Sequence, residues 1–109
     1  MALDTAGANL MLDSLGTATT YLGLLNSGTE LAGGSYARIA VTFAAAASGS
    51  MAMSGGTRQF DVPAGSTVNQ FGLYSASSGG TRYGTGSLTS EVYGGAGLYD
   101  LTAITITQT

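Results

Sequence analysis

The strongest constraint on the fold comes from residues 35–43, SYARIAVTF, in which side chains of two kinds alternate. Successive side chains of a β-strand point to opposite faces, so this period of two predicts a strand with one face in a core. Arg38 lies on the face opposite that core, where a guanidinium can bind a carboxylate or a carbonyl. The apolar parity consists of Ala37, Ile39, Val41 and Phe43, and the other of Tyr36, Arg38, Ala40 and Thr42.

Beyond Thr17 the whole chain reads as short β-strands separated by glycine-rich turns. Strands that recur every 8–12 residues with such turns are typical of a sandwich or a small barrel. We therefore predict an all-β fold, a small antiparallel β-sandwich or barrel with one short N-terminal helix. The predicted strands cover 18–25, 35–43, 50–54, two segments within 58–76 joined at Pro63–Gly65, a glycine-rich edge strand at 81–88, and the closing stretch 98–109.

The one predicted helix covers residues 3–15, with Asp4 or Thr5 as its cap. Leu3, Ala6, Leu10, Met11 and Leu15 fall near one face, which we expect to be the buried one. A chain of 109 residues has the length of one domain. We expect a single domain over 1–109, with an N-terminal helix or arm at 1–16 and the sandwich at 17–109.

Composition excludes several kinds of chemistry. The chain contains no Cys, His or Lys, which removes thiol nucleophiles, the commonest general base, Schiff-base chemistry, thiolate metal ligands and the commonest nitrogen metal ligand. Charged residues make up 8% and the net charge is −3, with three scattered arginines as the only cationic side chains. We therefore expect no nucleic-acid or membrane binding, since each depends on clustered basic residues. The N-terminus also lacks the pattern of a secretory signal.

The remaining candidate site residues are acidic or aromatic. Six carboxylates are present, but no spacing favours a catalytic pair, so we interpret them as caps, turn residues and solvated charges. We predict no catalytic, cofactor-binding or metal-binding residue. Tyrosine and arginine favour protein and sugar contacts, although half-buried strand tyrosines are the commoner case. The acidic residues are Asp4, Asp13, Glu30, Asp61, Glu91 and Asp100, and the tyrosines are Tyr21, Tyr36, Tyr74, Tyr83, Tyr93 and Tyr99.

Three segments together resemble a family of proteins: ELAGGSYARIAVTFAAAASGS, FDVPAGSTVNQFGLYSASSGGTRYGTGSL and the closing LTAITIT. The chain is similar to small structural proteins of tailed bacteriophages, common in phages of actinobacteria, over the part from Glu30 to the C-terminus. Members of that family are usually labelled tail fibre or minor tail proteins, and similar small β proteins decorate capsids. The resemblance implies a non-enzymatic virion protein that is assembled in the host cytoplasm and released by lysis.

From this resemblance we expect first a capsid decoration protein that reinforces the shell, because the chain lacks a stalk. The alternative is a tail fibre or minor tail protein that binds a receptor or a host glycan. A carboxylate-based hydrolase ranks far below both. We expect a homotrimer that contacts other virion proteins, with strand addition by residues 101–109 or by the N-terminal segment. The predicted contact residues are Tyr36, Arg38, Tyr74, Arg82, Tyr83, Tyr99, Ile104 and Ile106.

Overall fold

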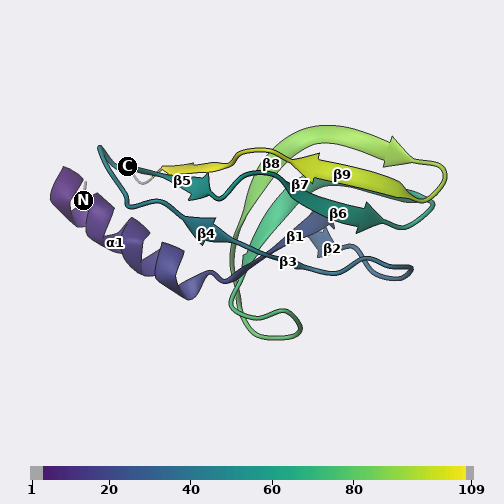
Figure 1. Cartoon of the computed structure of the whole chain (residues 1–109), viewed down its shortest axis with the longest axis horizontal. Helices are drawn as coiled ribbons and strands as arrows, with labels where there is room; N and C mark the ends of the chain where they lie inside the picture. The colour runs from purple at the N-terminus through teal and green to yellow at the C-terminus, as the bar shows by residue number, and fades with distance from the viewer. Residues whose placement is uncertain (1–3, 108–109) are drawn as a thin grey trace.

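The computed structural model describes residues 4–107, which form an elongated body of 46 × 25 × 23 Å. A helix lies at one end of the long axis and most of the β-strands occupy the other end (Figure 1). In chain order the elements are α1 Thr5–Ala18, β1 Tyr21–Asn26, β2 Thr29–Glu30, β3 Ile39–Ala40, β4 Thr42–Phe43, β5 Ser50–Ser54, β6 Arg58–Val62, β7 Ser66–Tyr74, β8 Arg82–Tyr93, β9 Gly97–Leu101 and β10 Thr105–Thr107.

The largest sheet has five strands in the order β2-β1-β7-β8, with β3 also paired to β1. All its pairings are antiparallel, and β8 lies at its edge. A two-stranded sheet, β6-β9, faces it, and the core lies between the two layers. Leu22, Leu24 and Phe71 of the large sheet pack there with Phe60 and Val62 of β6. This arrangement confirms the predicted all-β class and is compatible with a small β-sandwich.

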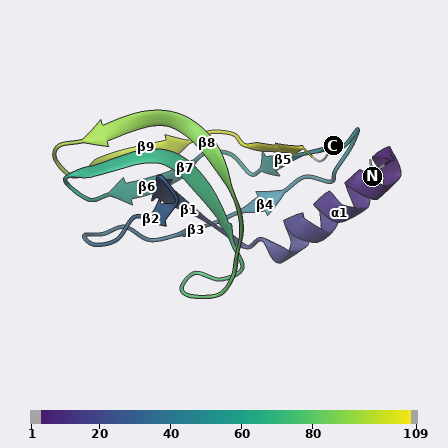
Figure 2. The same cartoon turned by 180° about the vertical axis from the view of Figure 1, so that it is seen from behind.

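A smaller sheet in the order β10-β5-β4 extends the body toward α1. Seen from behind, the helix again lies beside β4 and β5, away from the sandwich (Figure 2). Two side chains fix it there. Asp13 Oδ1 accepts a hydrogen bond from the Ala46 amide at 2.7 Å, and Asn9 Oδ1 accepts one from the Gly49 amide at 2.9 Å. The helix is thus bound to the β4–β5 turn by polar contacts as well as by packing.

The predicted strand at 35–43 is correct in its faces from Ile39 onward, but it is wrong at Ala37, which is exposed, and in its continuity. Val41 is buried and Phe43 is half-buried, whereas Ala40 and Thr42 are exposed, as the alternation predicts. The segment is nevertheless split into β3, which pairs with β1, and β4, which pairs with β5. It crosses from one sheet to another, and Tyr36 and Arg38 precede the first paired residue. Alternation reports which side faces the core, and it does not report which partner strand lies alongside.

The predicted helix is confirmed, but its predicted buried face is wrong. Leu10 and Met11 are 73% and 53% exposed, while Ala8 and Leu12 are buried. The helix also continues to Ala18, three residues beyond the expected end, and Leu3 lies outside the described residues. The contacts of Asn9 and Asp13 with the β4–β5 turn orient the helix, so that Ala8 and Leu12 face the small sheet. A pattern of apolar side chains alone could not anticipate those two polar contacts.

Most other strand predictions agree with the structure. The strand predicted at 18–25 is β1, but it begins only at Tyr21, because α1 continues to Ala18. The strand at 50–54 is found with the same bounds, and β6 and β7 flank the predicted turn at Pro63–Gly65. The predicted edge strand is β8, although it continues to Tyr93. The closing stretch is divided into β9 and β10, because residues 102–104 leave β6 and the chain then pairs with β5.

Candidate functional site

A cluster of polar side chains centred on Arg38 lies on the outer face of the large sheet. The Arg38 guanidinium binds the Glu30 carboxylate through two hydrogen bonds, Nε to Oε2 at 2.9 Å and Nη2 to Oε1 at 2.8 Å. Its Nη1 donates to the backbone carbonyls of Ala76 at 2.9 Å and Gly79 at 2.8 Å. The Arg38 side chain is only 11% exposed. One guanidinium therefore ties the β2 strand to the loop between β7 and β8.

Two tyrosines complete this cluster. The Tyr36 hydroxyl donates a hydrogen bond to Glu30 Oε2 at 2.7 Å and accepts one from the Leu24 amide at 3.0 Å. Arg38 Cζ lies 3.6 Å from the centre of the Tyr74 ring, a cation–π contact. We call Glu30, Tyr36, Arg38 and Tyr74 the Arg38 cluster. The cluster lies over the strand pair β1–β7, and it joins segments that are far apart in the sequence.

The electrostatics of the Arg38 cluster shift the pKa values of Glu30 and Tyr36 away from neutral pH. Burial by itself would raise the pKa of Glu30, but hydrogen bonds from Arg38 and Tyr36 outweigh it and hold this pKa below its ordinary value of 4.5. Burial and the hydrogen bond to Glu30 raise the pKa of Tyr36. Both shifts move titration away from neutral pH, whereas a general acid or base works best with a pKa near the working pH. The cluster is therefore suited to holding loops in place.

The other two arginines also bind backbone carbonyls. Arg58 donates to the carbonyls of Ala40, Ser54 and Gly56, at distances between 2.6 and 3.0 Å. Arg82 Nη1 donates to the Gly28 carbonyl at 2.9 Å, which links β8 to the β1–β2 turn. Each of the three arginines thus connects segments of its own chain.

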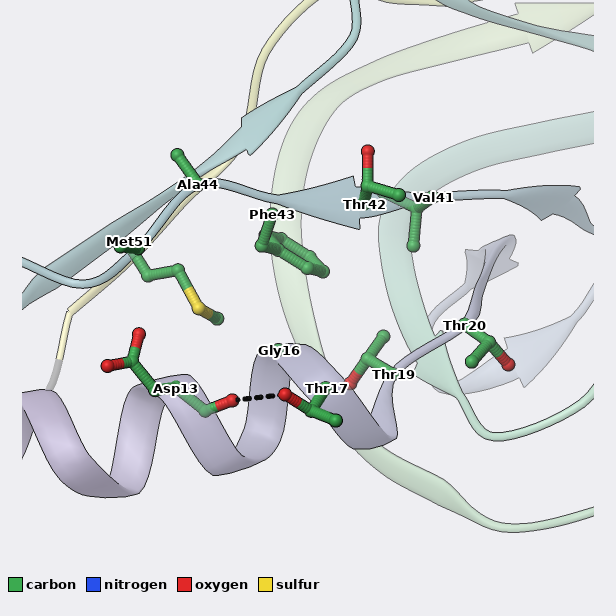
Figure 3. Close-up of a pocket in the computed structure, with 11 residues that line it drawn as sticks. Asp13, Gly16, Thr17, Thr19, Thr20, Val41, Thr42, Phe43, Ala44 and Met51 are labelled. Carbon is green, nitrogen blue, oxygen red and sulfur yellow. Dashed lines mark hydrogen bonds between the residues drawn. The ribbon is translucent and has the colours of Figure 1, made fainter.

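A groove of about 480 Å³ lies between the C-terminal half of α1 and strands β4 and β5 (Figure 3). Thr42 and Phe43 line one side, and Asp13 and Thr19 line the other. Thr19 is buried, and its Oγ1 has no hydrogen-bond partner among the described residues. Asp13 is the one titratable side chain among the described residues of the lining, so the groove offers hydroxyl and apolar contacts but no acid–base pair.

Within residues 4–107 no three carboxylates come close enough together to hold a metal ion. The α1 helix, the one helix in that range, is too short and insufficiently apolar to cross a membrane.

One comparison with known proteins gives a match. A family model described as podophage GP4 fiber I protein gp80 matches residues 5–104, which is most of the chain. The chain belongs to this family. No curated protein and no solved structure matches it significantly. Membership of the gp80 fibre family confirms the resemblance to phage structural proteins at the level of a fibre-like virion component. It supports the tail-fibre expectation better than the capsid-decoration expectation, which no finding supports.

The sequence-predicted contact residues of this gp80 family member do not form one surface. Tyr36, Arg38 and Tyr74 meet in the Arg38 cluster, which binds residues of its own chain. Ile104 belongs to the core at 5% exposure, and Tyr99 and Ile106 pack partly against that core. The exposed members are Arg82 and Tyr83, on β8. Whether any of the eight contacts another protein stays a prediction.

Glu30 is the functional residue that sequence reasoning missed. The sequence alone favours a solvated charge at this position, yet Glu30 binds both Arg38 and Tyr36. The available signal was its position, eight residues before Arg38 across a Gly33–Gly34 turn. A turn of this kind can bring two segments together, and a lone arginine beside a lone carboxylate is a natural pair.

Proposed function

We propose that this chain is a non-enzymatic structural domain of a phage tail fibre. The observation that carries the proposal is the match of the gp80 fibre family model to residues 5–104. Because the match extends through α1 and all but the last strand, it concerns the whole architecture and not one motif.

The placement of charges supports a structural role. Arg38, Arg58 and Arg82 all donate to backbone carbonyls of turns or neighbouring strands. Such contacts stabilise loops without a ligand, and they leave a surface made mostly of small polar residues. A free protein needs surface charge to remain soluble. A virion protein is held in contact with other copies of itself and with other virion proteins, so it needs less surface charge.

The partners that we propose are other copies of this chain and other proteins of the tail. Assembly would take place in the cytoplasm of the infected cell, with release by lysis. The shared segments described above also support an origin in a phage of actinobacteria. A host glycan is not part of the proposal, because the tyrosines are distributed between the Arg38 cluster, the core margin and β8.

The test is the position of the chain on the intact particle. Antibodies against the folded protein, coupled to gold, should label the tail fibres in electron micrographs, and the density of residues 5–104 should fit a fibre in a cryo-EM map. Labelling confined to the capsid surface would reject the fibre assignment and restore capsid decoration. Labelling of neither part would reject a virion role.

A further inference from the structure

The groove between α1 and the small sheet is bordered by the C-terminal end of the helix. Gly16 and Thr17 line the groove, and the helix ends at Ala18. The last four carbonyl groups of a helix have no partner within the helix. Here the Leu15 carbonyl accepts a hydrogen bond from the Thr19 amide at 2.8 Å, but those of residues 16–18 accept no backbone hydrogen bond from residues 4–107. No basic side chain lies in this last turn, so the helix end places negative partial charge beside the groove.

Asp13 adds a full negative charge to the same side of the groove. Its Oδ1 accepts the hydrogen bond from the Ala46 amide at 2.7 Å, which leaves Oδ2 for another donor. The ion pair found among the described residues joins Arg38 to Glu30, so no cationic side chain of that range balances Asp13. Figure 3 shows the Asp13 carboxylate on the side of the helix that is turned toward the strands. One carboxylate oxygen is therefore available to a ligand.

Exposed hydroxyls of the lining have already donated their hydrogens. Thr17 Oγ1 donates to the Asp13 carbonyl at 3.0 Å, and Thr20 Oγ1 donates to a carbonyl that follows β7 at 2.7 Å. A hydroxyl in this state still has lone pairs and can only accept from a ligand. The buried Thr19 hydroxyl, in the same lining, has no partner among the described residues. This side of the groove thus has acceptors in excess, and a ligand that fits it must donate.

The opposite side of the groove offers apolar surface. Phe43 is half-buried, and Ala44 and Ala45 beside it are exposed. In Figure 3 the Phe43 ring lies between β4 and the helix. An aromatic face attracts a cation, and the alkyl stem of a long cationic side chain packs on apolar surface. With a volume of about 480 Å³, the groove has the size of a site for an organic ligand and is far larger than a bare metal ion needs.

We infer that this groove binds a lysine side chain of a different protein, with its ammonium group at Asp13 and the helix end and its stem along Phe43. An ammonium is a compact charge with three donors and no acceptor, which suits a wall of scattered acceptors. An arginine fork would need both carboxylate oxygens, and Asp13 Oδ1 is already bound by the Ala46 amide. The chain contains no lysine, so a second copy cannot supply the side chain. The inference rests on the proposed function only in taking the other protein to be a neighbour in the virion.

The isolated protein tests the groove with n-butylammonium chloride, which has the stem and the charge of a lysine side chain. In an NMR titration at constant ionic strength, the amide signals of Thr17, Phe43 and Ala46 should shift and saturate, with a dissociation constant on the order of 10 mM. n-Butanol has the same stem without the charge and should bind about tenfold more weakly. n-Butylguanidinium should also bind more weakly than n-butylammonium, because Asp13 offers it one oxygen.

A pair of matched variants separates this site from a general effect of charge. Asp13→Asn keeps a carbonyl oxygen for the Ala46 amide and removes the charge, so it should retain the fold, which circular dichroism checks, and weaken n-butylammonium binding about tenfold. Asp4→Asn removes the same charge at the other end of the helix, where Asp4 is the exposed N-cap residue and its side chain makes no capping hydrogen bond. It should bind n-butylammonium as the natural protein does.

Cross-linking on purified particles tests the source of the lysine. A carbodiimide joins a carboxylate to an amine that touches it, with loss of water, and should link Asp13 to a lysine that mass spectrometry of the digested particle identifies. Because the chain contains no lysine, every such link identifies a different protein. Links from Asp4, which is equally exposed to the reagent, should be rarer.

Several results would overturn the inference. In the titration they are the absence of saturable shifts, equal binding of n-butanol, or equal weakening by Asp13→Asn and Asp4→Asn. On particles that contain the chain, they are the absence of Asp13–lysine links or equal linking of Asp4. The titration uses the isolated protein, so its result stands whether or not the particle-labelling experiment supports the fibre assignment, and the two proposals are tested separately.

Discussion

Gly23 of β1 and Gly72 of β7 lie directly opposite each other in the large sheet, and the Tyr74 ring occupies the space above both of them. A Cβ atom at either position would come within 2.8 Å of Tyr74 Cε2. At Gly23 it would also lie 2.8 Å from Glu30 Oε2 and from the Tyr36 hydroxyl. The Arg38 cluster therefore rests in a notch that two missing side chains create.

Gly23→Ala should destabilise the protein by about 1–3 kcal/mol, because the added methyl group forces the Arg38 cluster to move. Urea unfolding followed by circular dichroism measures the effect. Gly84→Ala is the matched control, since a Cβ atom there meets nothing within 4 Å. Its free energy of unfolding should be unchanged or slightly higher. Equal effects of the two substitutions would show that the notch plays no part.

Arg38→Ala should lower the free energy of unfolding by about 2–3 kcal/mol, because it removes two of the hydrogen bonds to the Glu30 carboxylate, leaving that of Tyr36, and takes the guanidinium donor from two carbonyls. Arg38→Lys should recover only part of the loss, since one ammonium cannot reproduce the two-pronged contact with Glu30. Hydrogen exchange of the Thr81 amide, which donates to Ser75 Oγ at 2.9 Å, reports on the adjacent loop and should accelerate in both variants. Full recovery by lysine would mean that charge alone matters.

The stabilisation by Glu30 should depend on pH in one direction. Its pKa in the folded protein is lowered from 4.5, so its contribution is present above that pH and is lost as pH falls through the folded pKa. The difference in unfolding free energy between the natural protein and Glu30→Gln should be full at about pH 6 and shrink in more acidic solution. Denaturant titrations at several pH values measure it. A difference that stays constant from neutral to acidic pH would contradict this assignment.

Asp13→Ala should loosen the attachment of α1 to the β4–β5 turn. It removes the acceptor of the Ala46 amide and should cost about 1 kcal/mol. Hydrogen exchange at Ala46 should then become faster, while amides of β1 and β7 keep their protection. Ser14→Ala, at an exposed position on the same helix, is the control and should change neither. Faster exchange throughout the protein would show that the helix is integral to the sandwich.

The sequence predicts those features of the fold that depend on one strand or one turn by itself. The parity of Val41 and Phe43, the turn at Pro63–Gly65 and the edge position of β8 follow from side-chain alternation and turn chemistry. The split of 35–43 between two sheets could not be predicted, because it depends on which strands lie alongside. The orientation of α1 likewise depends on Asn9 and Asp13 meeting the β4–β5 turn.

The candidate site was predicted only in part. Placing Arg38 on the outer face, where it can bind a carboxylate, follows from its parity, and the structure supplies that carboxylate in Glu30. Tyr36 and Tyr74 were grouped with it as contact residues, and they do meet it. Their common location over Gly23 and Gly72 rests on the β1–β7 register, which pairs residues about 50 positions apart. No local pattern carries that information.

The pairing of β1 with β7 also governs how the chain must fold. Strand β1 pairs with β7 in the large sheet. During synthesis β1 leaves the ribosome long before β7 has been made. Loop closure between such distant segments is slow, and apolar strands that wait for partners are prone to aggregate. We therefore expect the large sheet to form late and cooperatively, after most of the chain is available, with α1 and the β4–β5 hairpin as the segments able to organise first.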